Sequence, residues 1–372
     1  MREGWKYQKL GELVKVINGL WVGKKPPFTN VAVVRNANFT KSCTLDMSNI
    51  AYIDVEEKQF NTRELQYADI IIEKSGGNEK QPVGRPVFFN IKDRGYSFSN
   101  FTATLRVVSS DIVPEYLYKV LLAQYKQGVT KRLQSKTTGL HNLDFKSYLK
   151  SVIPIPSCEK QLSIVSELDK INELIRLKKE QLKDYDNLAQ SIFYEMFGDP
   201  VVNEKGWEVK KFADLYKLKS GDSLSAKNFV EGEIPVYGGN GISGYHNDFN
   251  MDGDFIIIGR VGVYCGNVRE VHGKFWLTDN AFQLFYNREI QYPCFIHYLL
   301  EILDLHHYAN AAAQPVISNL TLKDVEIIIP PLPLQQAFAQ RIELIKKQKA
   351  EIQNTIADLE TLLASRMQYW FD

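Results

Sequence analysis

Cysteine is scarce in this 372-residue chain, which contains only Cys43, Cys158, Cys265 and Cys294. No two of them are close enough to form a CxxC pair, so the sequence predicts neither a structural zinc site nor a disulfide framework. This cysteine usage is typical of a reducing compartment, and we expect a cytoplasmic location.

Long apolar runs are also absent. No stretch approaches the roughly 18 uninterrupted apolar residues that a transmembrane helix requires. The first ten residues, MREGWKYQKL, lack the apolar core of a secretion signal. We therefore expect neither secretion nor a membrane partner. With 44% hydrophobic and 24% charged residues the chain has the composition of a globular protein, and its length predicts two or three domains.

Motifs of catalysis and nucleotide binding are missing as well. The chain contains neither the GxxxxGK[ST] loop of ATPases nor the GxSxG elbow of hydrolases. KPPF at residues 25–28 approaches the [DN]PP[YF] loop of amino-methyltransferases, but Lys25 stands where that chemistry needs an amide or carboxylate. His306 and His307 have no third metal ligand nearby, and the glycine-dense residues 238–244 lack the lysine of a phosphate-binding loop. We predict no catalytic residue, no metal site and no cofactor bound by this chain.

Charge is nearly balanced, with 45 Lys and Arg against 44 Asp and Glu, yet it is unevenly distributed. Residues 1–150 carry 23 basic and 14 acidic side chains, a net charge of +9. Residues 201–330 carry 11 basic and 16 acidic side chains, a net charge of −5. The first block can therefore attract a polyanion through its overall charge, whereas the second can do so only through a local patch.

An internal repeat divides the chain into two halves. Four kinds of segment recur in the same order in both halves. They are an opening segment that begins with Trp, an Asn-Leu segment, a proline-rich exit segment, and a final segment that runs from Ser to Phe. The matched segments are residues 5–13 with 207–215, 142–146 with 319–323, 153–156 with 330–333, and 191–197 with 365–371. The offset in residue number between matched segments falls from 202 to 174 along the chain. The length differences between the two copies therefore lie inside the globular regions. Each copy therefore consists of a globular domain, a proline hinge and a long helix.

Each copy ends in a heptad pattern. Apolar positions recur at alternating steps of three and four residues from Leu168 to Met196 and from Ile342 to Trp370, with Lys178 and Lys349 as interruptions. The pattern predicts two helices of about 28 residues, or about 42 Å, which exceeds one turn of DNA. We expect the two helices to pair, because two equivalent apolar stripes would otherwise each need a separate partner. The alternative is that each helix packs on its own globular domain.

Strand patterns dominate the two globular regions. The segments that read as strands are residues 31–34, 70–72, 87–89, 104–108, 255–258, 282–286 and 326–329. Residues 114–125 and 293–303 begin with proline and have the spacing of short helices. The sequence therefore predicts an α+β fold with a pseudo-twofold repeat of mixed, β-rich domains and long helices. Its expected parts are domains at residues 1–156 and 199–333, and long helices at 157–198 and 334–372.

Polar and basic loops follow several of these strands. Arg, Lys, Asn and Gln can read base edges, while Lys, Ser and Thr can hold phosphates. The candidate DNA-contact residues in the first half are Lys74, Asn78, Lys80, Arg85, Lys131, Arg132 and Lys136. In the second half they are Tyr237, Asn240, Tyr245 and Arg260. The alternative for each residue is a solvated turn without a ligand.

The chain as a whole resembles the specificity subunits of type I DNA restriction–modification systems. The resemblance rests on YGGNGISGY at residues 237–245, on DGDFIIIGRVG at 252–262, on the two GW openings, and on the proline-rich exits that lead into heptads. It covers essentially the whole length. The first half matches more loosely, with KSGG at residues 74–77 where the second half has GRVG at 259–262.

The resemblance implies two target-recognition domains separated by an antiparallel pair of long helices. Each domain would read one half of a split double-stranded DNA site in the major groove. The helices would space the half-sites and dock two methyltransferase subunits, which carry S-adenosylmethionine and methylate adenine N6. Motor-nuclease subunits can join such a complex. On this hypothesis the present chain is not an enzyme.

Two other functions remain open at this point. One is a stand-alone DNA-binding regulator that needs no methyltransferase, and the other is a coiled-coil scaffold whose globular ends bind protein. Apolar residues exposed on the outer faces of the helices would favour the specificity subunit over the regulator. The scaffold predicts that the first domain has no affinity for DNA despite its net charge of +9.

Overall fold

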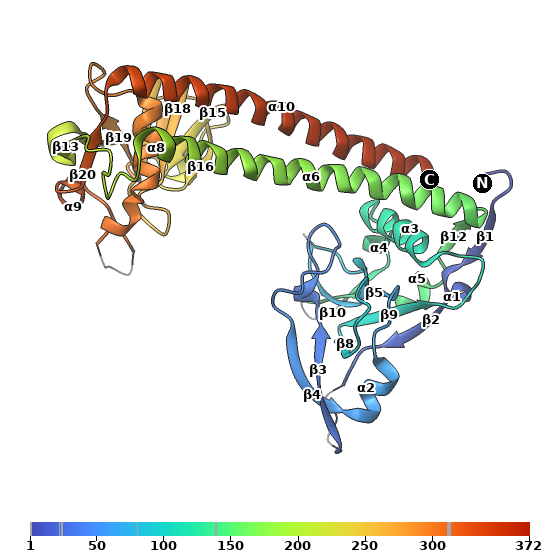
Figure 1. The fold of residues 1–372 in the computed structure, drawn as a ribbon. Helices are drawn as coiled ribbons and strands as arrows, with labels where there is room; N and C mark the ends of the chain where they lie inside the picture. Colours follow the sequence, from blue (N-terminus) through green and yellow to red (C-terminus); the bar gives the residue numbers. More distant parts are fainter. Residues whose placement is uncertain (1, 22, 24, 80, 138–139, 311–313) are drawn as a thin grey trace. The chain divides into compact units, whose positions relative to one another are not determined.

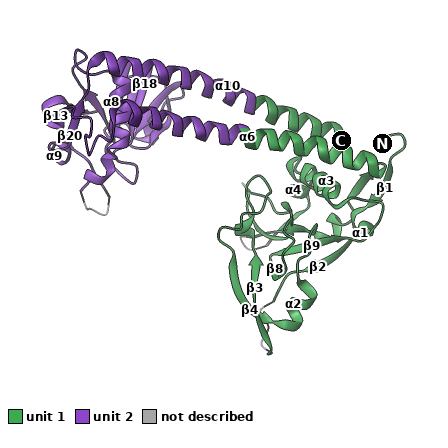
Figure 2. Cartoon of the chain, viewed as in Figure 1, with its two compact units in different colours: residues 1–177, 357–372 green, residues 178–356 purple. Residues whose placement is uncertain are grey.

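The computed structural model describes residues 2–21, 23, 25–79, 81–137, 140–310 and 314–372. The chain divides into a first unit, residues 1–177 and 357–372, and a second unit, residues 178–356 (Figure 2). Each unit contains one β-rich domain and part of both long helices, so the predicted α+β architecture is confirmed (Figure 1). Among the described residues, no helix is long and apolar enough to cross a membrane.

The β-rich domain of the first unit is built on small sheets. Its strands are β1 (Lys6–Lys9), β2 (Val14–Asn18), β3 (Phe28–Val34), β4 (Ala51–Glu56), β5 (Ile70–Glu73), β6 (Ser75–Gly77), β7 (Pro86–Phe88), β8 (Tyr96–Phe98), β9 (Thr102–Val107), β10 (Gln134–Thr137), β11 (Leu140–Leu143) and β12 (Val152–Ile155). The helices are α1 (Leu10–Leu13), α2 (Glu57–Arg63), α3 (Pro114–Lys126), α4 (Val129–Arg132) and α5 (Phe145–Tyr148). The principal sheet has the order β2-β9-β5-β7, and β4-β3-β8 and β10-β11-β6 form further sheets.

The second unit contains one larger sheet. Its strands are β13 (Glu208–Lys211), β14 (Lys217–Ser220), β15 (Ile234–Gly238), β16 (Gly241–His246), β17 (Met251–Gly259), β18 (Val268–Leu277), β19 (Ala281–Phe285) and β20 (Glu326–Ile329). Six of these strands pair in the order β14-β19-β17-β18-β15-β16. The helices of the domain are α7 (Phe212–Leu215), α8 (Pro293–Ile302) and α9 (Asn319–Leu322).

The repeat is visible in how each domain closes on its own ends. In the first unit the opening strand β1 pairs antiparallel with the exit strand β12, and Lys6 stands opposite Ile155. In the second unit β13 pairs with β20 in the same way, and Glu208 stands opposite Ile329. Each proline-rich exit therefore leaves its domain beside the Trp-led opening, in both copies of the repeat.

The two long helices are α6 (Cys158–Phe197) and α10 (Leu332–Phe371), each of 40 residues. Each helix begins before its heptad pattern, and near its beginning Gln161 of α6 or Gln335 of α10 hydrogen-bonds to the domain that precedes the helix. In the first unit Lys160 of α6 lies 4.4 Å from the ring centroid of Trp370, and Glu167 pairs with Arg366 of α10. The residue numbers of the contacting partners decrease along α10 as they increase along α6. The two helices are therefore antiparallel in this unit.

The second unit shows the same antiparallel pairing. Asp186 of α6 pairs with Lys349, and Glu195 lies 3.9 Å from the guanidinium of Arg341. Lys349, which interrupts the apolar pattern, is thus matched by a carboxylate on the other helix. The predicted pairing of the two helices is confirmed within each unit.

Aromatic packing joins the long helices to the domain of the second unit. Phe193 and Phe197 of α6, Phe295 of α8 and Phe338 of α10 are fully buried in one cluster. The ring centroids of Phe197 and Phe295 are 4.8 Å apart, and those of Phe197 and Phe338 are 5.4 Å apart. Because four large rings from three helices meet here, the domain and the helix pair of this unit share one hydrophobic core.

Candidate nucleic-acid interface

Lys74 and Arg260 occupy the same position in the two domains, one residue out of step with the match of KSGG to GRVG, which placed Lys74 opposite Gly259. Each follows the buried central strand of its sheet, β5 in the first unit and β17 in the second. The amide of Lys74 donates to the carbonyl of Phe101 (2.8 Å), and the amide of Arg260 donates to the carbonyl of Asn280 (2.9 Å). The two domains therefore present a cation at an equivalent point of the backbone, although the side chains differ.

The side chains of these two cations are held in the same way. Lys74 Nζ donates to Asn18 Oδ1 (3.0 Å), and Arg260 Nη1 donates to Ser220 Oγ (3.4 Å). Asn18 and Ser220 are themselves matched by the shift of 202 that relates the two openings. Burial lowers the pKa of Lys74, which is half-buried at this site. The guanidinium of Arg260 also lies 5.4 Å from the ring centroid of Phe282.

Both cations keep donors available for an anionic or base-edge acceptor. A lysine ammonium has three donors and an arginine guanidinium has five. The Lys74 ammonium donates to Asn18 in the contacts described above. The Arg260 guanidinium donates to Ser220 and to the carbonyl of Asp279 (3.3 Å). The arrangement suits a phosphate or the acceptor edge of guanine.

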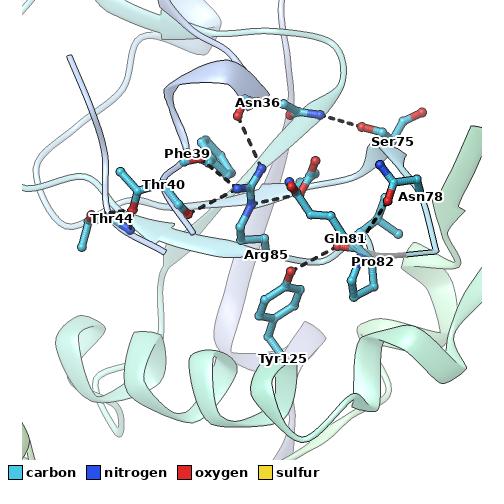
Figure 3. Close-up of polar contacts among 12 residues, drawn as sticks. Asn36, Phe39, Thr40, Thr44, Ser75, Asn78, Gln81, Pro82, Arg85 and Tyr125 are labelled. Atoms are coloured by element: carbon cyan, nitrogen blue, oxygen red, sulfur yellow. Dashed lines mark hydrogen bonds and ion pairs between the residues drawn. The ribbon is translucent and has the colours of Figure 1, made fainter. Parts of the chain in front are cut away.

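Arg85 is a correction to the predicted contact set. The residue is only 4% exposed, and its Nε lies 3.1 Å from the Glu73 carboxylate inside the first domain. Its Nη1 donates to the carbonyls of Phe39 (2.8 Å) and Thr40 (3.3 Å) (Figure 3). A guanidinium engaged in this way cannot reach a DNA strand, so Arg85 is a structural residue.

The contacts of Arg85 connect the loops of the first domain. Its Nη2 donates to the carbonyl of Asn36 (3.4 Å), and Asn36 Nδ2 in turn donates to the carbonyl of Ser75 (2.7 Å) (Figure 3). Burial raises the pKa of Glu73, and the positive charge of Arg85 opposes that rise. The ion pair thus fixes the segment after β5, where Lys74 begins the candidate loop, against residues 36–40.

The remaining candidates of the first domain lie at its surface where the structure describes them. Asn78 is exposed, and its Oδ1 accepts from the amide of Gln81 (2.9 Å), which shapes the loop. Lys131 and Arg132 are exposed on α4. Lys136 belongs to β10, but its side chain lies outside the described part. Lys80 lies outside the described residues altogether.

The glycine-rich motif of the second domain forms a β-hairpin rather than a phosphate-binding loop. β15 and β16 pair antiparallel, and the turn between them consists of Gly239 and Asn240. Gly241 has a φ of +94°, a conformation that residues with a Cβ rarely adopt. A Cβ atom on Gly239 would lie only 2.8 Å from the carbonyl oxygen of Val261. Glycine is therefore required so that the turn can pack closely against the backbone that follows β17.

The hairpin presents the three candidates of this motif differently. Asn240 is exposed at the turn, and Tyr245 is 55% exposed on β16. Tyr237 is half-buried, with its ring 5.5 Å from that of Phe275 in an edge-on contact. Asn240 and Tyr245 can therefore contact a ligand fully, whereas Tyr237 offers only one edge.

A groove beside this hairpin brings in Asn280, a residue that the sequence did not single out. It has a volume of about 560 Å³, and Asn280 and Gln314 line it together with Asn240 and Val261. Asn280 was missed because its sequence neighbours form an ordinary turn between two strands. The signal that identifies it is the backbone bond from Arg260 to Asn280, which only the folded chain reveals.

No cluster of three or more His, Cys, Asp or Glu side chains that could hold a metal ion occurs among the described residues. His306, one of the adjacent histidines, instead contacts the backbone. Its Nδ1 lies 3.0 Å from the carbonyl oxygen of Cys265. The candidate interface therefore consists of cations, amides and aromatic side chains.

The sequence profile of the type I restriction modification DNA specificity domain matches this chain twice, at residues 2–184 and at residues 204–361. The two matches correspond to the two copies of the repeat. Together they cover most of the chain.

Specificity subunits of type I restriction enzymes align with the chain. The type I restriction enzyme EcoprrI specificity subunit of Escherichia coli is 29% identical over 220 residues, 55% of this chain and 54% of that protein. The type I restriction enzyme MjaIX specificity subunit of Methanocaldococcus jannaschii is 23% identical over 383 residues, 91% of this chain and 86% of that protein. The chain thus spans about half of the first relative and most of the second.

Solved structures share the fold. The S subunit of a type I restriction-modification system from M. genitalium superposes with a TM-score of 0.57 at 15% identity, covering 99% of this chain and 96% of that one. A chain from a structural study of complex assembly and conformational transition of the type I R-M system gives a TM-score of 0.64 at 18% identity, covering 100% and 98%.

Proposed function

We propose that this chain, which belongs to the type I restriction–modification DNA specificity family, selects a bipartite double-stranded DNA target, with each domain reading one half. Its role is DNA recognition, and it is a non-catalytic component of the restriction–modification system. The observation that carries the two-half proposal is the equivalence of Lys74 and Arg260. One scaffold presents a cation at the same backbone position twice, while the neighbouring side chains differ.

The net charges of the two domains are consistent with each domain reading one half of the DNA target. The first domain, with its net charge of +9, can hold phosphates through overall attraction. The second domain, with a net charge of −5 over residues 201–330, must rely on local contacts such as those of Arg260. We therefore expect the isolated chain to bind DNA weakly and with a steep dependence on salt.

The partners that we propose are two methyltransferase subunits docked on the long helices. Leu188 on α6 and Leu362 on α10 are related by the repeat shift of 174, and each is 45% exposed. Exposed leucines at equivalent positions suit two copies of one partner better than two different proteins. The partner subunits would supply S-adenosylmethionine, and motor-nuclease subunits would join where the system also cleaves DNA. The complex would act in the cytoplasm.

Co-purification from the native cell tests the assembly. We expect the tagged chain to recover two methyltransferase copies. Leu188→Asp and Leu362→Asp should each lose one copy, because a carboxylate in an apolar contact is costly to desolvate, and the double variant should lose both. Leu320→Asp is the matched control, since Leu320 is 72% exposed and belongs to α9 rather than to a long helix.

Two other outcomes would contradict the proposal. A chain recovered alone that still binds DNA with sequence selectivity would be a stand-alone regulator. A chain recovered without methyltransferase and without DNA affinity would be a protein-binding scaffold.

A further inference from the structure

The groove of the second domain is lined by the β15–β16 hairpin, by residues from 224 to 229, by the segments after β17 and β18, and by Gln314. Among the described residues, no Lys, Arg, Asp or Glu lines it. Its polar side chains are Ser225, Asn240, Ser243, Thr278, Asn280 and Gln314. A lining of this kind offers neutral hydrogen-bond donors and acceptors, which recognise shape and hydrogen-bonding pattern rather than charge.

Three amide side chains line the groove. The side chains of Asn240, Asn280 and Gln314 make no hydrogen bond within the described part of the chain. Structural amides of the same domain behave differently. Asn319 accepts from the amide of Leu218 (2.9 Å) and donates to the carbonyl of Leu218 (3.0 Å). The groove amides thus retain both their donors and their acceptors for a ligand.

Cations neighbour the groove without entering its lining. Arg260 directly precedes Val261, which lines the groove, and Lys227 directly follows Ala226, which also lines it. The guanidinium of Arg269 packs against Gly241, where a Cβ atom would meet it at 3.2 Å. Neutral amides flanked by cations match the division of labour in DNA recognition, in which cations hold phosphates and amides read base edges.

The first domain differs at the equivalent point. Phe101 accepts from the amide of Lys74 as Asn280 accepts from the amide of Arg260, so Phe101 and Asn280 correspond. Phe101 is 45% exposed and has no amide to read a base edge. A position that changes from amide to aromatic between two copies of one scaffold has the behaviour expected of a residue that sets specificity rather than one that maintains the fold.

We propose that Asn240, Asn280 and Gln314 are specificity-determining residues of the second domain and that they read adenine in its half-site. An Asn or Gln amide can accept from adenine N6 and donate to adenine N7 in the major groove, a pair that no other base offers. This inference rests on the proposed function, since it assigns the chemistry of recognition to one of the two domains.

A binding selection with the assembled methyltransferase complex tests the inference. A duplex library is randomised one position at a time across both half-sites, and the base preference of each position is measured. Asn240→Ala, Asn280→Ala and Gln314→Ala should each lower the preference for adenine by about 5- to 150-fold at a position of one and the same half-site. The other half-site should keep its preferences, which also shows that the variant complex is folded.

Two further variants sharpen the test. Asn280→Asp keeps the shape of the side chain but only accepts hydrogen bonds, so it should shift the preference from adenine toward cytosine. Asn247→Ala is the matched control, because Asn247 is an exposed asparagine just after β16 that does not line the groove. It should retain the wild-type preferences.

The outcomes separate this inference from the proposed function. If the wild-type complex selects no bipartite sequence, the proposed function fails. If the wild type selects one and the groove variants keep every base preference, or change the half-site read by the first domain, the inference is overturned and the proposed function stands.

Discussion

Gln161 and Gln335 make the same three hydrogen bonds in the two halves of the chain. Gln161 Oε1 accepts from the amide of Val113 (2.8 Å), and its Nε2 donates to the carbonyls of Asp111 (2.8 Å) and Pro156 (3.0 Å). Gln335 Oε1 accepts from the amide of Tyr292 (2.8 Å), and its Nε2 donates to the carbonyls of Ile290 (3.0 Å) and Pro330 (2.7 Å).

These two glutamines fasten the beginning of each long helix to the domain that precedes it. Both are fully buried, and each bonds a proline-hinge carbonyl five residues before it as well as the segment that leads into α3 or α8. The hinge is therefore a fixed joint in each unit. A recognition domain that must present its loops in one register relative to a helix requires such a joint.

Loss of one glutamine should destabilise its unit. Gln335→Ala leaves the amide of Tyr292 and two carbonyls without partners, and we expect the free energy of unfolding to fall by about 1–3 kcal/mol or more. Urea denaturation of the full chain measures the change. Gln336→Ala, at an exposed position on the same helix, should change stability by less than about 0.5 kcal/mol. Equal stability of the two variants would show that the joint contributes nothing.

The ion pair of Arg85 and Glu73 should behave as a structural element. Arg85→Ala leaves a buried carboxylate unpaired, and removal of one partner of such a pair costs about 3–5 kcal/mol. The exposed Lys131→Ala should leave stability unchanged within about 0.5 kcal/mol. Replacing both partners, as in Glu73→Gln with Arg85→Met, should recover part of the loss. A fully stable Arg85→Ala that lost only DNA affinity would restore Arg85 to the contact set.

A partly buried charge cluster makes the stability of the second unit depend on pH. Burial alone would lower the pKa of His297 on α8, but Glu270 at 3.5 Å and Glu301 at 3.4 Å raise it to about 9. Burial would raise the pKa of Glu270, but His297 and Lys346 of α10 hold it at about 2. Glu270 therefore stays ionised above pH 5, and His297 is the group that titrates.

A raised histidine pKa contributes stability below its ordinary value of 6.5 and loses that contribution as the pH rises through about 9. We expect the free energy of unfolding to fall by about 2–3 kcal/mol between pH 6.5 and pH 9. His297→Gln should flatten this slope. His272→Gln should retain it, because His272 is exposed and its ion-pair partner, Asp254, is also exposed. A slope that persists in His297→Gln would assign the pH dependence to another group.

Arg260 should matter for recognition but not for folding. Its hydrogen bonds to Ser220 and Asp279, at 3.4 and 3.3 Å, are long, so Arg260→Ala should unfold at nearly the wild-type denaturant concentration. The same variant should lose about 1–3 kcal/mol of discrimination at one half-site, and Lys74→Ala should act on the other half-site. Arg288→Ala removes the same charge at an exposed site after β19 and serves as the control. Unaltered selectivity in Arg260→Ala would remove Arg260 from the readout.

The parts of the fold that the sequence predicted correctly depend on local patterns. The heptads from Leu168 and Ile342 predicted paired helices because their period reports one continuous apolar stripe. β18 was missed because its buried Val268, Val271, Phe275 and Leu277 do not alternate with a period of two. Its place in the sheet comes from antiparallel pairing with the preceding strand β17 and from parallel pairing with β15, which lies farther back in the sequence.

The candidate site was less predictable for the same reason. Residue type suggested that Arg85 contacts DNA, but its burial depends on Glu73 and on residues 36–40 packing around it. Asn280 was overlooked because its relation to Arg260 is a long-range backbone contact. Hydrogen-bonding chemistry can be read from residue types, but access to solvent and proximity across the fold cannot.

Genome-wide mapping of N6-methyladenine tests the central claim most directly, in cells that carry the wild-type chain, Arg260→Ala or a deletion. We predict a bipartite methylated motif in the wild type, complete loss of that motif on deletion, and relaxation of only one half in Arg260→Ala. A methylation map that does not change on deletion of this chain would contradict the claim that the chain selects the sites.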